Sequence, residues 1–129
     1  MLPITSAPPL LLVAVGGACG SMLRYLVGRW ALVNFGPGFP FGTWAVNIAG
    51  GLAMGLLAGW LSRLDEDGEG LRLLLGVGLM GGFTTFSAFS LEVFAMINRG
   101  EIGVAGAYAV FSVAGSVLAV MTGVWLMRI

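Results

Sequence analysis

MGGFTTFSAFS, Met80–Ser90, lies inside an apolar segment long enough to cross a membrane, yet it is a poor sequence for an uninterrupted helix. Two adjacent glycines precede the β-branched pair Thr84 and Thr85, and both residue types have low helix propensity. We therefore predict a helix break there. A break frees backbone carbonyls at membrane depth, which is tolerated only where they are buried in protein or line water. Broken helices near the midplane bind ions in several transport folds.

The composition around this segment is that of an integral membrane protein. The chain has 129 residues, of which 58% are apolar and 9% are charged, whereas a typical soluble domain has about 25% charged residues. Twelve charges cannot provide polar cover for a surface that faces water. The net charge of zero argues against nucleic acid as a partner.

Four segments are long enough to span a bilayer, which needs roughly 20 apolar residues per helix. They cover about residues 10–33, 41–61, 71–97 and 102–127, so we predict one all-α membrane domain over residues 1–129. Residues 1–9 are expected to form a short tail. The charged sequence RLDEDGEGLR, residues 63–72, is expected to be a solvated connection.

The orientation of these spans is not decided by charge, although Lys and Arg usually collect in cytoplasmic loops. Three arginines fall on the side of the two termini and two or three on the other side: Arg63, Arg72 and Arg128 against Arg29, Arg99 and the deeper Arg24. Either something else sets the topology, or the chain inserts both ways. Insertion both ways would allow an antiparallel homodimer. We favour a dimer, since four short spans are too few to enclose a pathway.

Several polar residues lie inside the spans and are candidates for function. Arg24 shares a face with glycines at spacing four, and it is either a functional charge or an arginine that reaches toward the interface. Asn47 lies on one face with Thr43. Its amide either makes an interhelical hydrogen bond that holds a dimer together or donates into a pathway.

The third and fourth spans add aromatic and hydroxyl side chains at helical spacing. Phe86 and Phe89 share a face and are either core residues or edge-on rings that accept a dehydrated anion. Tyr108, Ser112 and Ser116 form a hydroxyl stripe, and the alternative is that the serines bond to their own helix. We find no metal-ligand spacing, carboxylate pair or activated nucleophile, and the chain has no His and one Cys. An enzyme is therefore not expected.

Together, these motifs resemble the Fluc fluoride channels, also called CrcB proteins. The resemblance rests on GGFTTFSAFSLE at Gly81–Glu92, GGACGSMLRY at Gly16–Tyr25 and GTWAVNIAGG at Gly42–Gly51, in that order along nearly the whole chain. It implies a dual-topology homodimer in the cytoplasmic (inner) membrane that exports fluoride passively through two antiparallel pores and confers fluoride resistance.

The resemblance also implies roles for single residues. Ring edges of two phenylalanines would contact fluoride, and an amide and several hydroxyls would line its path: Phe86, Phe89, Asn47, Tyr108, Ser112, Ser116 and Thr43. Backbone carbonyls of Gly81 and Thr84, from both subunits, would hold a buried structural Na⁺ at the dimer centre. Arg24 would be a vestibule or structural residue.

Two other classes of protein have four small spans or similar glycine faces. A small multidrug exporter is a dual-topology dimer, but it needs a carboxylate in its first span, and no Asp or Glu precedes Asp65. A membrane scaffold would use the glycine faces alone and would leave the helix break unexplained.

Overall fold

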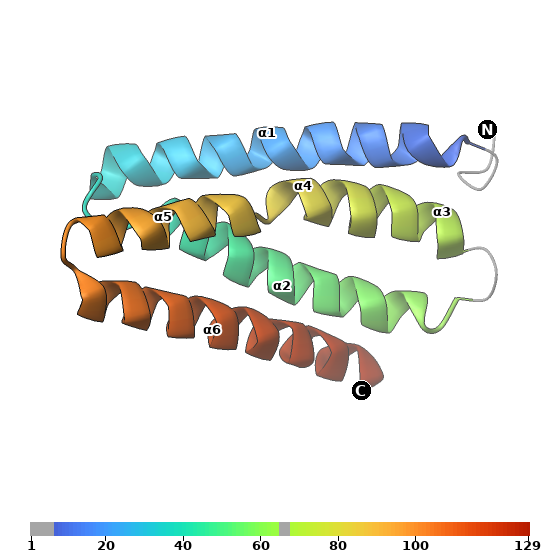
Figure 1. The fold of residues 1–129 in the computed structure, drawn as a ribbon. Coiled ribbons are helices and arrows are strands. Elements are labelled where there is room, and N and C mark those ends of the chain that lie inside the picture. Colours follow the sequence, from blue (N-terminus) through green and yellow to red (C-terminus); the bar gives the residue numbers. More distant parts are fainter. Residues whose placement is uncertain (1–6, 65–67) are drawn as a thin grey trace.

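The computed structural model describes residues 7–64 and 68–129, which are helical throughout apart from short connections (Figure 1). Four helical units are long and apolar enough to cross a membrane, as predicted. Three of them are α1 (Pro9–Phe35), α2 (Phe41–Leu61) and α6 (Ile102–Arg128). The third unit, Glu69–Asn98, is divided into α3 (Glu69–Leu71), η3 (Arg72–Met80), α4 (Gly81–Phe83) and α5 (Phe86–Asn98).

The predicted bounds of the four spans differ from the observed bounds by at most two residues. The charged connection between the second and third spans is shorter than predicted. There the side chains of Glu69 and Arg72 are exposed as expected, but the expectation of a connection up to residue 72 is wrong in part, because the helix begins at Glu69. Arg72 donates two hydrogen bonds of 2.8 Å to Glu69, and an acidic residue in the first turn suits the positive end of a helix. Residues 65–67 and 1–6 lie outside the described residues.

The predicted break in the third span is confirmed at Thr84 and Thr85. Both residues have extended backbone angles, with φ and ψ of −86° and 157° at Thr84 and −150° and 122° at Thr85. Before the break, η3 is π-helical, and the amide of Gly81 donates to the carbonyl of Gly76, five residues earlier. After it, the Thr85 hydroxyl caps α5 by accepting a 3.2 Å hydrogen bond from the amide of Ala88.

Glycines set the packing of the helices into two close pairs. A Cβ atom at Gly16 or Gly20 of α1 would overlap backbone atoms of η3 and α4, and one at Gly51 or Gly55 of α2 would overlap backbone atoms of α6. Figure 1 shows α1 beside the third unit and α2 beside α6. In a membrane, where lipid is as apolar as leucine, such close backbone contact drives association.

The interior of the single chain is small. Its buried apolar cluster contains Phe89, Met96, Ala105 and Tyr108, close to the loop between α1 and α2. Most large apolar side chains point outward instead, as expected for a protein surrounded by lipid or by another copy of itself.

Candidate functional site

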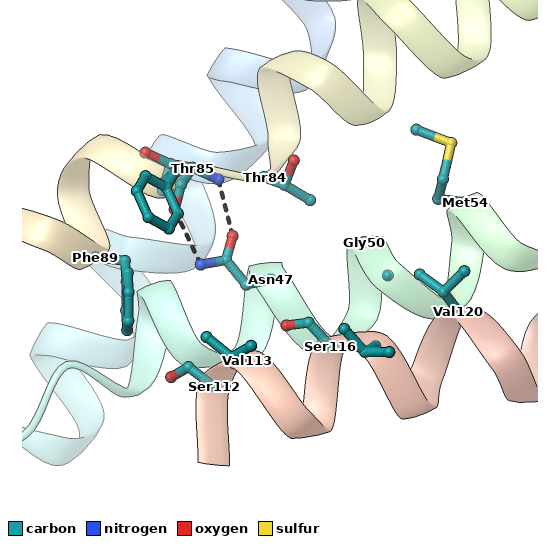
Figure 2. A pocket seen from close by; sticks show the side chains of 13 residues that line it. Asn47, Gly50, Met54, Thr84, Thr85, Phe89, Ser112, Val113, Ser116 and Val120 are labelled. Atoms are coloured by element: carbon teal, nitrogen blue, oxygen red, sulfur yellow. Dashed lines mark hydrogen bonds between the residues drawn. The ribbon is translucent and has the colours of Figure 1, made fainter. Parts of the chain in front are cut away.

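A cavity of about 390 Å³ lies beside the helix break, between α2, α5 and α6. We call it the break cavity. Its lining includes an amide, hydroxyls and two aromatic rings, contributed by Asn47, Thr84, Phe86, Phe89, Ser112 and Ser116. Figure 2 shows Asn47 pointing from α2 toward the break, with Ser112 and Ser116 on the neighbouring α6. Five of the seven residues proposed from the sequence for one pathway therefore share one cavity.

Asn47 is bound to the backbone of the break by two hydrogen bonds (Figure 2). Its Nδ2 donates to the Thr85 carbonyl at 3.0 Å, and its Oδ1 accepts from the Thr85 amide at 2.8 Å. The side chain thus takes the place of a neighbouring backbone and holds Thr85 in its extended conformation. An Asn amide has two N–H donors, and the described residues show an acceptor for only one of them.

Backbone carbonyls lose their helical partners at the break, among them those of Gly81 and Thr84. In a continuous helix the amide of Thr85 would donate to the carbonyl of Gly81, and the amide of Ala88 would donate to that of Thr84. Here the Thr85 amide donates to Asn47 and the Ala88 amide donates to the Thr85 hydroxyl. The carbonyls of Gly81 and Thr84 are consequently released from the helical ladder.

Arg24 makes the other contact to this region. Its Nε donates a 2.9 Å hydrogen bond to the carbonyl of Gly82, on the last turn before the break. The side chain of this intramembrane arginine thus has a hydrogen-bond partner within the protein.

The two phenylalanines have different surroundings. Phe89 is 8% exposed and belongs to the buried cluster, whereas Phe86 is 76% exposed on the open side of the break cavity. Their ring centroids are 5.6 Å apart, with an angle of 47° between the planes. The Phe89 ring is fixed by packing, whereas the Phe86 ring lies on the surface of the chain.

Ser112 contributes a buried hydroxyl to the break cavity. Its Oγ has no hydrogen-bond partner among the described residues. A buried polar atom left unpaired costs free energy, so native proteins normally supply a partner. The Ser112 hydroxyl is therefore a candidate donor to a polar group in the cavity.

Tyr108 and Thr43 do not line the break cavity but meet at Glu92, a residue for which the sequence suggested no role. The hydroxyls of both donate to the Glu92 carboxylate at 2.6 Å, one to each oxygen. Thr43 and Glu92 also line a second cavity of about 340 Å³ under the loop of residues 36–40, which we call the loop cavity. Glu92 is the one acid well inside an apolar segment, so it requires polar partners. This requirement is the feature of the sequence that could have indicated a role for Glu92.

Four helical spans, the third of them interrupted beside a cavity, define the class of small multi-pass helical membrane proteins. Within that class, the chain belongs to the CrcB family. The sequence model described as "CrcB-like protein, Camphor Resistance (CrcB)" matches residues 11–124.

Relatives named "Fluoride-specific ion channel FluC" are similar along nearly the whole chain. That of Phenylobacterium zucineum is 57% identical over 120 residues, which are 92% of this chain and 94% of the relative. That of Novosphingobium aromaticivorans is 55% identical over 116 residues, 88% of each chain. That of Sphingopyxis alaskensis is 53% identical over 116 residues, 90% of this chain and 92% of the relative.

Proposed function

We propose that this protein is a fluoride-specific ion channel that releases fluoride passively across the cytoplasmic membrane and thereby confers fluoride resistance. The names of its relatives favour this function over a cation exporter or a scaffold. The break cavity is the structural observation that carries the proposal, since it joins neutral donors and aromatic rings in an apolar surrounding.

The chemistry of the break cavity suits a small, strongly hydrated anion. The second N–H of Asn47 and the unpartnered hydroxyl of Ser112 are neutral donors that replace lost water. The edges of Phe86 and Phe89 carry partial positive charge and add weak attraction. Ser116 extends the donors along α6. Neutral groups hold the ion weakly enough for it to leave again, which conduction requires.

Beyond Phe89, the proposed path continues to Tyr108 and Thr43. Both hydroxyls now donate to the Glu92 carboxylate. A hydroxyl has a single proton to donate, so fluoride competes with Glu92 for the same two donors.

We also propose that two copies form an antiparallel homodimer with two pores. The balanced arginines permit insertion in both directions. The break cavity is open at the exposed ring of Phe86, and Gly81 is exposed beside the break. A second copy seated on this face would close the cavity and exclude lipid from the released carbonyls.

The carbonyls of Gly81 and Thr84 fit a structural Na⁺, because hard cations prefer oxygen ligands and because both groups are free of helical partners. In the proposed dimer, the two subunits would supply these carbonyls together. The ion would contribute charge neutralisation and would tie the two breaks to each other.

Transfer of the purified protein into Na⁺-free buffer is expected to reduce fluoride flux or dimer content only slowly. The reason is burial, since a second copy would cover Gly81. Flux and gel-filtration profiles taken at intervals after transfer measure the rate of loss. Immediate loss, restored at once when Na⁺ returns, would instead indicate a freely exchanging surface site.

Efflux from liposomes tests the proposed function. Vesicles that contain the wild-type protein are expected to release fluoride rapidly and chloride very little. The Phe86→Ile and Phe89→Ile variants are expected to lose fluoride flux while they still assemble, because both remove an aromatic edge but keep an apolar side chain. Ion-selective electrodes measure efflux, and gel filtration measures assembly.

Leu91→Ile is a matched control, since Leu91 is also exposed on α5 but lies outside the break cavity. Wild-type flux in both phenylalanine variants would contradict the pathway. A folded wild-type dimer without flux of either ion would contradict the channel itself and favour a scaffold.

A further inference from the structure

Phe39 lies in the loop between α1 and α2 and has no role in the function described so far. The loop backbone around it is tightly fixed. The Phe41 amide donates to the Phe39 carbonyl at 2.8 Å, across Pro40, whose φ and ψ are −78° and 61°. These angles are those of an inverse γ-turn, and the proline ring locks φ. The turn directs Phe39 back onto the helices, where it packs against the buried cluster.

The ring of Phe39 contacts Tyr108 edge-on. Their centroids are 5.3 Å apart, with 81° between the planes. A second aromatic neighbour of Tyr108 is Phe89, with ring centroids 5.2 Å apart and 52° between the planes. Tyr108 is 2% exposed, and its ring contacts both a loop residue and a residue of the proposed pathway.

Tyr108 also contacts residues that line each of the two cavities. Phe89 and Ser112 line the break cavity, while Phe39, Thr43 and Glu92 line the loop cavity. Tyr108 lines neither, but it contacts Phe89 of the break cavity and Phe39 and Glu92 of the loop cavity. On the proposed path, Tyr108 would therefore lie at the junction of the two cavities.

We propose that Phe39 is a positioning residue for the loop-side end of the pathway: it fixes the ring of Tyr108 and so keeps the passage between the two cavities too narrow for anions larger than fluoride. This inference rests on the proposed function. The hydrogen bond to Glu92 fixes only the hydroxyl and leaves the ring free to tilt about it, whereas the packed rings of Phe39 and Phe89 restrict this tilt. Without the Phe39 ring, the vacated space adjoins Tyr108 directly.

Liposome efflux of fluoride and chloride, measured side by side for wild type and Phe39→Ala, tests this inference. We expect the ratio of chloride to fluoride efflux to rise about tenfold in Phe39→Ala, the upper end of what one aromatic pair contributes. Phe39→Tyr keeps the ring and is expected to restore the wild-type ratio. A merely structural loop residue would change the amount of folded protein but not this ratio.

Phe35→Ala is the matched control. Phe35 lies at the same end of the molecule and is 56% exposed, and its ring contacts Trp30 and Phe41 but not Tyr108. An unchanged ratio in Phe39→Ala, or an equal rise in Phe35→Ala, would overturn the inference while leaving the channel function intact. Absence of fluoride efflux in wild type would overturn both.

If Phe39→Ala does not fold, the same efflux ratio is measured for Phe39→Leu, because leucine keeps most of the apolar contact but has no aromatic edge. A raised chloride ratio in Phe39→Leu supports the inference, and a wild-type ratio overturns it.

Discussion

Asn47→Ala is expected to abolish most fluoride flux and to destabilise the protein. The substitution removes the donor proposed for the ion, and loss of a hydrogen bond to a charged group costs roughly 1.5–3 kcal/mol, so flux should fall about tenfold to a hundredfold. It also leaves the amide and carbonyl of Thr85, which is 9% exposed, without their partner. Each such group costs about 1–3 kcal/mol.

Efflux and thermal unfolding of the same preparation separate these two effects. Asn47→Asp keeps an acceptor for the Thr85 amide but loses the donor. It should therefore retain part of the stability, while its fluoride flux should be as low as that of Asn47→Ala. Asn34→Ala is the control, since Asn34 is exposed and donates only to Trp30 of its own helix. Wild-type flux in Asn47→Ala would remove this residue from the pathway.

Gly55→Val is expected to prevent folding. A Cβ at Gly55 would overlap the carbonyl oxygen of Val120 and lie 3.0 Å from its Cα, so the two helix backbones would have to separate. Overpacking of a core typically costs about 1–3 kcal/mol, and more where the obstacle is backbone. Separation of α2 from α6 would also move Asn47 away from Ser112 and Ser116, which share the break cavity.

The yield of monodisperse protein in gel filtration and its melting temperature measure this effect. Gly106→Ala on α6 is the control, because no described atom lies within 4 Å of a Cβ there. Its stability should be unchanged or higher by up to about 1 kcal/mol, since alanine favours helix over glycine. A folded Gly55→Val protein that melts like wild type would show that α2 and α6 do not depend on this contact.

Much of the fold was predictable because it depends on local properties. Apolar length fixes the four spans, and the run from Gly81 to Thr85 fixes the break. The π-helical form of η3 was not predictable, since it depends on how its carbonyls and amides meet across five residues rather than on residue type. The small-residue faces indicated close helix contact, but they did not indicate which helices pair.

The site shows the same limit. Helical spacing identifies the face on which a side chain lies but not its neighbour on another helix. Spacing predicted one hydroxyl stripe on the fourth span, but its members have different neighbours. Ser112 and Ser116 line the break cavity, whereas Tyr108, one turn earlier, donates to Glu92. The role of Glu92 depends on Thr43, which is 49 residues away in the chain, and no periodicity connects the two.

The break at Thr84 and Thr85 also gives the middle of the protein two helix ends of opposite polarity. Each helix carries roughly half an elementary charge at its termini, positive at the amino end and negative at the carboxyl end. The carboxyl end is α4, where the carbonyls of Gly81 and Thr84 are released, and the amino end is α5, which begins at Phe86 beside the break cavity. One interruption of the backbone would thus attract a cation on one side and an anion on the other.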